Sequence, residues 1–355
     1  MPRPLPGTHL PGRPLTALAP MQDVTTLDFM RLIGEFGAPD YYFTEYFRVH
    51  VHSTLERHIV DSILHHGTGR PVFAQMIGED VTELRRTARQ LARLPVAGID
   101  LNMGCPAPKI YKKNVGGGLL RNPDHVERIF AGLREAIDGI FSVKMRIGFD
   151  DTALFEEIVC LLRAYEVDLV SIHGRTVAQG YRGDVRYDVI RDAAEELDCP
   201  VLANGNILCP EMAKDVLACT GAAGVMIGRH AIRNPWIFRQ TREHLSGVAC
   251  FRPTLADVRH YVDRLFEVTH APAIPEFPHI SRMKKFLNFI GLGVDPDGDF
   301  LHRMRRAQTA SELFSICDAF MVRGGRGTRP FALQPYSGLV ARPNCESPHR
   351  APQPA

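Results

Sequence analysis

The chain has 355 residues, of which 45% are hydrophobic and 23% are charged. This length and composition suffice for one large domain and a smaller one, and they exclude a disordered or fibrous protein. The formal net charge of +2 neither indicates nor excludes a nucleic-acid partner, because such binding depends on a local basic surface.

The cysteines and the N-terminus bear on the compartment. Eight cysteines are scattered without a CxxC pair, which indicates a reducing compartment and argues against a disulfide framework or a metal site. Residues 1–14 lack the apolar run of a signal peptide, and we expect them to be flexible. No stretch approaches the roughly 18 apolar residues of a membrane span. We therefore expect a cytoplasmic protein, with no membrane partner and no metal, and a monomer.

Short apolar runs alternate with longer amphipathic segments from Leu15 to about Leu245. Eight runs have the length of buried parallel strands: Leu15–Met21, Asp40–Tyr46, Pro71–Ile77, Gly98–Asn102, Phe141–Ile147, Asp168–His173, Pro200–Asn204 and Gly224–Ile227. The segments between them predict helices, for example Val81–Leu94, Asp124–Ile137, Thr152–Tyr165 and Cys209–Cys219. This alternation predicts an α/β fold, a TIM (β/α)8 barrel over residues 15–245. An open doubly wound sheet is disfavoured because no GxGxxG follows the first strand.

The remainder of the chain differs in pattern. Residues 246–254 predict a linker, and the apolar spacing from Leu255 to about Val322 predicts a small helical domain. The glycine-, arginine- and proline-rich residues 323–355 predict a disordered tail.

A cysteine follows the fourth predicted strand in Asp100-Leu-Asn-Met-Gly-Cys105-Pro, ahead of three glycines, Gly116 to Gly118. Most free cysteines are small buried hydrophobes. Cys105, however, lies on a polar loop at the mouth of the barrel, which favours a functional thiol. The glycine-rich loop predicts a segment that closes over a substrate.

Polar residues end the next strands. Lys144 stands among apolar neighbours, which predicts a buried ammonium that meets a ligand; a Schiff-base nucleophile and a solvated strand-edge lysine are the alternatives. His173 and Asn204 end the following strands and can line the same planar ligand. Asn204-Gly205-Asn206 and Gly228-Arg229 occupy the loops where barrel enzymes bind phosphate, although glycines there can also serve tight turns.

Several of these motifs occur together in a fixed order, and together they resemble the tRNA-dihydrouridine synthase family. They run from Ala19-Pro-Met21 to the Asn234-Pro-Trp-Ile-Phe238 segment, and between these lie QMIG at Gln75, DLNMGCP, VKMR at Lys144, IHGRT at His173, ANG at Asn204 and MIGR at Gly228. The helical C-terminal region resembles the family's tRNA-binding domain. Two basic clusters lie there: Arg282, Lys284 and Lys285, and Arg303, Arg305 and Arg306.

The resemblance implies an FMN-dependent enzyme that reduces uridine in tRNA to dihydrouridine, with NADPH as the reductant. It implies Cys105 as the acid that protonates C5, and Asn102 and Arg175 as contacts of the uridine. The residues implied to bind FMN are Pro20, Met21, Gln22, Gln75, Lys144, His173, Asn204, Gly205, Asn206, Gly228 and Arg229.

Two positions depart from the family pattern, and other functions stay open. Asn206 stands where the family usually has aspartate, and Gln22-Asp23 stands where it usually has Ala-Gly. The alternatives are a flavin-dependent reductase of a free pyrimidine, similar to dihydroorotate dehydrogenase, an aldolase that uses Lys144, and a non-catalytic RNA-binding barrel. The target uridine is not predicted.

Overall fold

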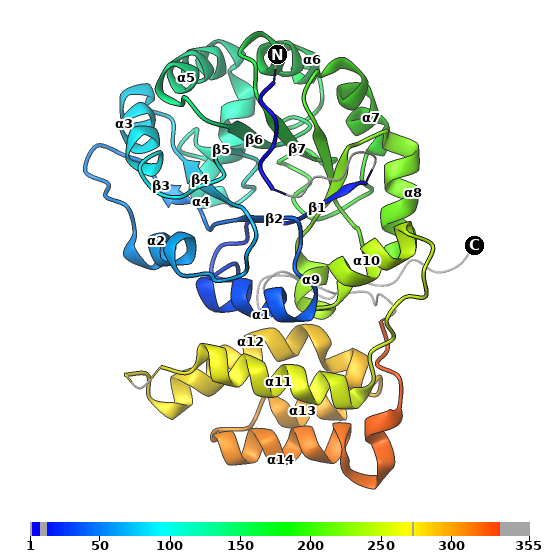
Figure 1. Ribbon diagram of the computed structural model, residues 1–355. Helices are drawn as coiled ribbons and strands as arrows, with labels where there is room; N and C mark the ends of the chain where they lie inside the picture. The colour runs from blue at the N-terminus through cyan, green and yellow to red at the C-terminus, as the bar shows by residue number, and fades with distance from the viewer. Residues whose placement is uncertain (1, 8–12, 272, 334–355) are drawn as a thin grey trace. The chain divides into compact units, whose positions relative to one another are not determined.

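The computed structural model describes residues 2–7, 13–271 and 273–333 (Figure 1). The parallel strands are β1 (Leu15–Leu18), β2 (Tyr41–Phe43), β3 (Phe47–Arg48), β4 (Val72–Ile77), β5 (Gly98–Met103), β6 (Phe141–Arg146), β7 (Leu169–His173), β8 (Val201–Asn204) and β9 (Gly224–Ile227). Strand β2 pairs with both β1 and β4, and β1 pairs with β9, so the sheet closes. The predicted eight-stranded TIM barrel is confirmed.

The second barrel strand is divided, which the sequence did not predict. Strands β2 and β3 both pair with β4, with Tyr42 beside Val72 and Phe47 beside Met76. Between them the Thr44 hydroxyl accepts the backbone N–H of Gln75 at 3.0 Å. A side-chain oxygen thus replaces a carbonyl in the ladder, because a buried N–H needs a partner.

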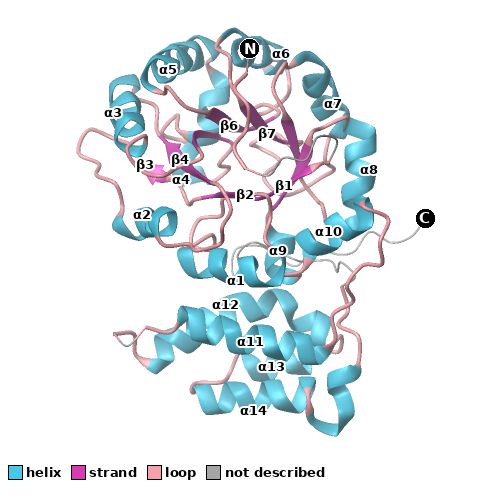
Figure 2. Cartoon of the chain, in the orientation of Figure 1, coloured by secondary structure: helices cyan, strands magenta, loops and turns pink. Residues whose placement is uncertain are grey.

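Helices surround the strands of the barrel (Figure 2). They are α1 (Leu27–Gly37), α2 (Arg57–Leu64), α3 (Val81–Leu91), α4 (Pro108–Tyr111), α5 (Pro123–Ala136), α6 (Phe155–Ala164), α7 (Tyr187–Glu196) and α8 (Pro210–Thr220), with the 3-10 helix η1 (Gly116–Arg121) after β5. The four helices named as examples from the sequence are all present, with ends shifted by up to three residues. Asp80 and Asn122 cap α3 and α5 by accepting backbone N–H groups.

The barrel interior is apolar at the N-terminal ends of the strands. Its side chains include Leu15, Phe73, Leu169, Leu202 and Met226, and Leu5 packs against this cluster. We call this part the lower half of the interior and the part at the C-terminal strand ends the upper half.

The N-terminal segment is held to the barrel. The Arg3 N–H donates to Asp168 Oδ1 at 2.7 Å, and the Tyr41 hydroxyl donates to the Pro6 carbonyl at 2.9 Å. Residues 2–7, predicted to be flexible, thus make two long-range hydrogen bonds with the barrel. Residues 1 and 8–12 lie outside the described part.

Contacts divide the chain into two compact units. The second contains residues 31–37, 208–210 and the chain from Arg229 onward. Its helices are α9 (Arg229–Arg233), α10 (Ile237–Leu245), α11 (Leu255–Thr269), α12 (Glu276–Val294), α13 (Asp299–Met304) and α14 (Ala310–Met321), followed by the 3-10 helix η2 (Arg323–Thr328). Thus α9 and α10, assigned from the sequence to the barrel, group with the helical domain.

The predicted tail begins too early. Residues 323–328 form η2, and Phe331 is buried and donates its N–H to the Pro253 carbonyl at 2.8 Å. Burial of this aromatic side chain explains why residues 323–333 are ordered despite their composition. Residues 334–355 lie outside the described part.

Two kinds of feature were not expected from the sequence: a membrane-spanning helix and a metal site. Across residues 2–7, 13–271 and 273–333, no helix combines the length and apolarity that crossing a membrane requires. Within the same ranges, no three His, Cys, Asp or Glu side chains gather as ligands of one metal ion.

Candidate functional site

The loop after β5 carries Cys105 and is anchored by one amide side chain. Asn102 Oδ1 accepts the backbone N–H groups of Gly104 at 3.1 Å and of Cys105 at 3.0 Å. The Cys105 side chain is half-buried. The thiol therefore stands on a backbone fixed at the mouth of the barrel.

Asn102 belongs to a buried polar network beneath this loop. Its Nδ2 donates to Gln75 Oε1 at 2.8 Å, and Gln75 Nε2 donates to Asp100 Oδ2 at 2.7 Å. Ser142 Oγ donates to the other Asp100 oxygen at 2.7 Å. Burial raises the pKa of Asp100 to about 6, against the lowering effect of its hydrogen bonds from Gln75 and Ser142. At neutral pH this carboxyl is thus an anion inside the barrel.

Lys144 lies on β6 in the same upper half. Its Nζ contacts Asn204 Oδ1 at 3.5 Å, and Asn204 Nδ2 donates to the Met226 carbonyl at 2.7 Å. Burial, then the charge of Arg146, lowers the pKa of Lys144 to about 8, while Asp100 and Cys105 act in the opposite direction. Lys144 was predicted to be buried and is half-buried, and its amine lies close enough to Cys105 for an electrostatic interaction.

A second group of predicted residues gathers at the ends of β7 and β8. Arg175 NH1 lies 3.3 Å from His173 Nε2 and donates to Asn206 Oδ1 at 3.3 Å. Arg175 is buried and also donates to the Gly183 carbonyl at 2.7 and 3.0 Å. The hydrogen bonds described for Arg175 place it with the predicted phosphate loop, and none joins it to Asn102.

The two departures from the family pattern share a backbone property. Asp23 has φ 61° and Asn206 has φ 47°, the left-handed region that favours glycine. Asp and Asn are the side chains that tolerate this region best. Asp23 donates its N–H to the Glu45 carboxylate. Both positions therefore carry residue types that tolerate the left-handed conformation found there.

The three glycines after Cys105 do not form an open flap. Gly116, Gly117 and Gly118 are buried in η1. A Cβ on Gly117 would come within 2.5 Å of Val177 and 3.0 Å of the Cys105 carbonyl, and Gly117 donates its N–H to that carbonyl at 3.3 Å. The predicted closing loop is thus packed against the base of the cysteine loop, and close packing is the reason for its glycines.

Sequence reasoning missed three residues that hold the site. Asp100 anchors Gln75, and the Tyr187 hydroxyl donates to the Gly205 carbonyl at 2.7 Å. Arg146 is buried, and it donates to the Gly104 carbonyl at 2.9 Å and to the Thr176 carbonyl at 2.8 Å. A signal for Arg146 exists, because a residue two positions after Lys144 on a strand points to the same side.

Several features fit a bound FMN. Gln22 Oε1 and Ser171 Oγ are buried and have no hydrogen-bond partner within the described residues, so a ligand can satisfy them. Gly205 has φ 126°, and a Cβ there would press on Val185 at 3.0 Å, so glycine brings its backbone close to the loop. Met21 and Gly228 adjoin, since a Cβ on Gly228 would lie 3.5 Å from Met21 Sδ. Arg229 follows directly as the first residue of α9.

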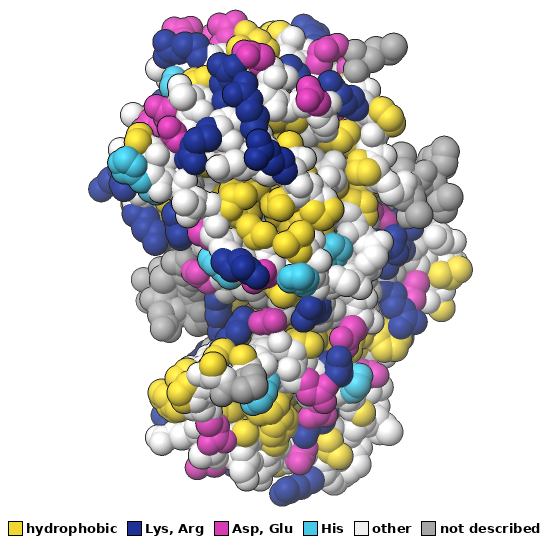
Figure 3. Space-filling view, turned by 60° about the vertical axis from the view of Figure 1, so that its left-hand side comes forward, with side chains coloured by type: hydrophobic (Ala, Val, Ile, Leu, Met, Phe, Trp, Pro, Cys, Tyr) yellow, Lys and Arg dark blue, Asp and Glu magenta, His cyan; other side chains and the backbone are white. Residues whose placement is uncertain are grey.

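The loop that carries Cys105 is also strongly cationic. Between Asp100 and Asp124 the chain has Lys109, Lys112, Lys113 and Arg121 but no acidic residue. All four cations are exposed. On the face drawn in Figure 3, Lys and Arg side chains gather over the barrel unit in the upper part of the view.

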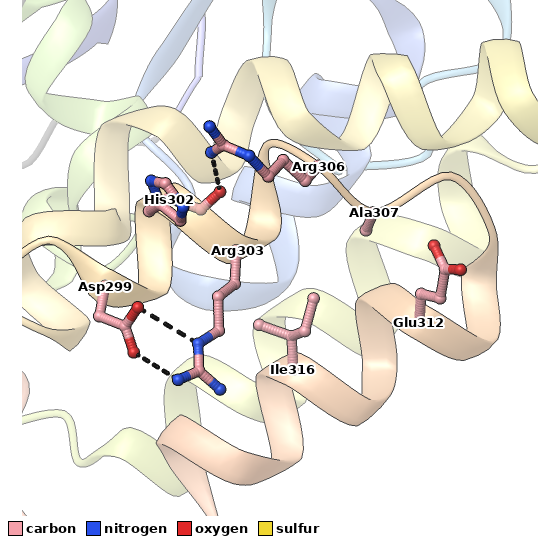
Figure 4. A pocket seen from close by; sticks show the side chains of 7 residues that line it. All are labelled: Asp299, His302, Arg303, Arg306, Ala307, Glu312 and Ile316. Atoms are coloured by element: carbon pink, nitrogen blue, oxygen red, sulfur yellow. Dashed lines mark hydrogen bonds and ion pairs between the residues drawn. The ribbon is translucent and has the colours of Figure 1, made fainter.

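One hydrogen bond joins the two basic clusters of the helical domain. Lys284 Nζ donates to the Arg305 carbonyl at 3.0 Å. A pocket beside them is lined by α13 and α14 (Figure 4). There Arg303 is paired with Asp299 at 3.0 Å, whereas Arg306 donates to the His302 carbonyl at 2.8 Å. Neutralisation by Asp299 leaves Arg306 the more available of the two for an anion.

Comparisons with known proteins agree with this arrangement. A family model described as Dihydrouridine synthase (Dus) matches residues 17–286. The tRNA-dihydrouridine(16) synthase of Neisseria meningitidis is 28% identical over 312 residues, which cover 85% of this chain and 93% of that protein. A probable tRNA-dihydrouridine synthase of Rhodobacter capsulatus is 34% identical over 266 residues, 74% of this chain and 81% of that protein. The tRNA-dihydrouridine synthase B of Salmonella typhimurium is 32% identical over 252 residues, 69% and 77% of the two chains.

Proposed function

Because this chain belongs to the dihydrouridine synthase family, we propose that it reduces uridines in tRNA to 5,6-dihydrouridine, with bound FMN and with NADPH as reductant. The observation that carries the proposal is the placement of Cys105. Its loop is fixed by Asn102 at the mouth of the barrel, near enough to the half-buried Lys144 for an electrostatic interaction. The proposal accounts for both groups as parts of one site.

The cofactor would lie across the upper half of the barrel. We assign its ring to Pro20, Met21, Gln22, Gln75, Lys144 and His173, and its phosphate to Asn204, Gly205, Asn206, Gly228 and Arg229. One Gln75 N–H is already used by Asp100, which leaves the other for the ring. When bound, the flavin supplies the hydride that adds to C6 of the uracil.

Cys105 is proposed to donate the proton to C5. Addition at C6 leaves an enolate conjugated to the C4 carbonyl, and this enolate needs a proton at C5. A thiol with an ordinary pKa of about 8.5 is mostly protonated at neutral pH and can serve as this acid. Asn102 holds the Cys105 backbone and is placed to face the uracil. Arg175 is proposed to help hold the extruded nucleotide through the loop that it fixes.

The exposed cations support an RNA substrate over a free pyrimidine. Phosphate contacts by Lys and Arg supply much of the affinity of nucleic-acid binding. Lys109, Lys112 and Lys113 lie on the loop of the acid itself, and Lys284 and Arg305 adjoin on the helical domain. A uridine must leave its stack to reach a barrel mouth, at a cost of a few kcal/mol, and these phosphate contacts can offset it.

One observation favours a second function. The lowered pKa of Lys144, about 8, leaves part of its amine neutral near pH 7, as a Schiff-base aldolase needs. Borohydride reduction in the presence of a carbonyl substrate would then trap an adduct on Lys144. We expect no adduct, together with a yellow protein that has flavin absorbance.

The deciding experiment measures dihydrouridine in tRNA incubated with pure protein, FMN and NADPH. Both an unmodified transcript and native tRNA from a strain that lacks dihydrouridine serve as substrates, with free uracil and orotate in parallel. We expect product on tRNA only. Removal of an acid typically costs 10²- to 10⁴-fold, so Cys105→Ala should lower kcat by about that factor.

Cys160→Ala is the matched control, because Cys160 is an exposed thiol on α6 away from the loop. It should retain wild-type kcat. Turnover of free pyrimidine at the tRNA rate, or full activity of Cys105→Ala, would contradict the proposal.

A further inference from the structure

Asp100 is a buried anion, and the mechanism proposed above gives it no role. It is 0% exposed, and its two oxygens accept Gln75 Nε2 and Ser142 Oγ at 2.7 Å each. A buried carboxylate is costly for stability unless something else requires it. We propose that Asp100 is a positioning residue: it sets the orientation of Gln75 and Asn102, and through them it holds Cys105 where the thiol meets the substrate. This inference rests on the proposed role of Cys105 as the acid.

The orientation of each amide follows from which of its atoms can donate a hydrogen bond. An ionised carboxylate only accepts hydrogen bonds, so Gln75 must turn its NH₂ group toward Asp100. Its carbonyl oxygen Oε1 is then the atom that faces Asn102, and Asn102 must present its own NH₂ to it, at 2.8 Å. Asn102 Oδ1 is thereby left to accept the N–H groups of Gly104 and Cys105.

Each of the two side-chain amides in this hydrogen-bond network, Gln75 and Asn102, has a single permitted orientation. If Gln75 were flipped, its oxygen would face the Asp100 oxygen and its NH₂ would face the NH₂ of Asn102. If Asn102 were flipped, its NH₂ would face two backbone N–H donors. The direction of every hydrogen bond from Ser142 to Cys105 is therefore decided by one acceptor-only group, Asp100.

The barrel itself does not need this anion. The lower half of the same interior is filled by apolar side chains such as Phe73 and Leu202. The network leads from Asp100 upward to the cysteine loop, and Lys144, the cation that acts on the charge of Asp100, lies in the same upper half. A charge placed this way serves orientation at the site.

The test exchanges the two groups. Asp100→Leu removes the acceptor that holds Gln75, whereas Asp100→Asn would keep an oxygen for Gln75 and direct its NH₂ to the Ser142 hydroxyl. Gln75→Glu sets two carboxylates against each other. Loss of comparable supporting residues costs about 10- to 100-fold, so each single variant should lose that much kcat while KM for tRNA stays within about threefold.

The double variant D100N/Q75E restores every hydrogen bond of the network. The NH₂ of the amide introduced at position 100 donates to the carboxylate introduced at position 75, and the oxygen of the same amide accepts from Ser142. The other oxygen of the new carboxylate accepts from Asn102, which therefore keeps its orientation. The double variant should return the reactivity of the Cys105 thiol to the wild-type level; kcat is not its readout, because Gln75 is also assigned to the flavin ring.

Alkylation of Cys105 by iodoacetamide, followed by mass spectrometry of its peptide, gives a readout without turnover. Its rate should change in each single variant and return in the double variant. Because this rate does not depend on the reaction, it also distinguishes the inference from the proposed function: tRNA reduction can fail while the alkylation pattern holds.

Asp168→Leu is the matched control. Asp168 is also 0% exposed and hydrogen-bonded, to Arg3, Arg134 and Phe141, but it lies at the opposite end of the barrel. It should lower the midpoint of thermal unfolding and leave kcat and the alkylation rate of Cys105 unchanged.

Three results would overturn the inference: wild-type kcat in Asp100→Leu, a Cys105 alkylation rate in the double variant no closer to wild type than in Gln75→Glu, or an alkylation rate that is the same as wild type in all three variants. If Asp100→Leu does not fold, Ser142→Ala replaces it. That change frees one Asp100 oxygen and lets the carboxylate rotate, so kcat should fall severalfold at constant KM, and wild-type kcat there would be equally contradictory.

Discussion

The two halves of the barrel interior are built by the same strands and differ in chemistry. On β4, Phe73 lies in the apolar lower half and Gln75, two residues later, in the polar upper half. On β8, Leu202 and Asn204 make the same change. Because alternate residues of a strand point to one side, a step of two residues turns a core position into a site position.

The difference shows where stability and function come from. The lower half gains free energy from apolar burial. The upper half buries Asp100 and Lys144, whose shifted pKa values record the cost of taking their charges out of water. We therefore expect substitutions in the lower half to change stability and substitutions in the upper half to change activity.

Phe73→Ala should have the largest effect on stability. Phe73 is 0% exposed and stacks on Phe43 at a centroid distance of 4.8 Å. Truncation of such a core aromatic costs about 3–5 kcal/mol of unfolding free energy. Urea denaturation measures this loss, and kcat of the folded fraction should stay at the wild-type value. A variant with unchanged stability but impaired kcat would contradict the division of the interior.

Lys144→Met should have the opposite pair of effects: activity should be lost while stability is kept. The lowered pKa of Lys144 means that its charge is disfavoured in the folded state, and an apolar side chain of similar volume removes that cost. We expect the variant to be at least as stable as wild type at pH 7 in denaturant unfolding, yet to bind FMN poorly and to lose activity.

The stability advantage of Lys144→Met over wild type should depend on pH, and it should decrease as the pH rises. Because the folded-state pKa of Lys144 is lowered to about 8, the unfolded chain binds more protons between pH 8 and about 10.5. Wild-type stability therefore rises with pH in that window, and the advantage of Lys144→Met shrinks there. An advantage that grows with pH would show that Lys144 is not held in a charge-disfavouring environment.

The barrel and most of the polar residues at its upper end could be predicted from the sequence. Both depend on patterns that are local in the chain. Strand length, alternation with helices and the polar residue at each strand end carry the fold, and the structure confirms it in all eight strands. The closeness of Lys144 to Asn204 followed from the same reasoning, since both lie at the ends of strands that line one mouth.

Interactions between distant residues could not be predicted. The hydrogen bond from Arg3 to Asp168 joins positions 165 residues apart, and the burial of Phe331 depends on its contact with Pro253. The surroundings of Arg175 were not foreseen for the same reason, because its partner Gly183 lies on a loop whose path is set by packing. From composition alone such segments are predicted to be flexible, because the sequence does not show their long-range partners.

The two ends of the barrel should also differ in how much they contribute to RNA binding. Lys109, Lys112 and Lys113 are exposed on the loop at the upper end. Each phosphate contact contributes about one unit to the dependence of log K on log salt, so replacing all three by Gln should reduce that slope by up to about three and raise KM for tRNA. Filter binding across a salt series measures the slope.

The matched control removes three exposed arginines near the C-termini of α3 and α6, at the lower end: Arg89, Arg93 and Arg163. The same net charge is lost, so a general electrostatic effect would change both slopes alike. Only the variant of the upper end should weaken binding.

The smallest expected effect is a change in stability that comes from backbone strain near the mouth of the barrel. Asp23, in the loop after β1, holds φ 61°, and glycine adopts this conformation without a steric cost. Its N–H bond to Glu45 is a backbone bond and survives substitution. Asp23→Gly should therefore raise the unfolding free energy by about 0.5–1 kcal/mol. Asp124→Gly is the control with opposite sign: Asp124 lies in the first turn of α5, where glycine costs about 0.5–1 kcal/mol in backbone entropy. Equal losses in both variants would mean that the Asp23 side chain contributes to the rim beyond filling a left-handed turn.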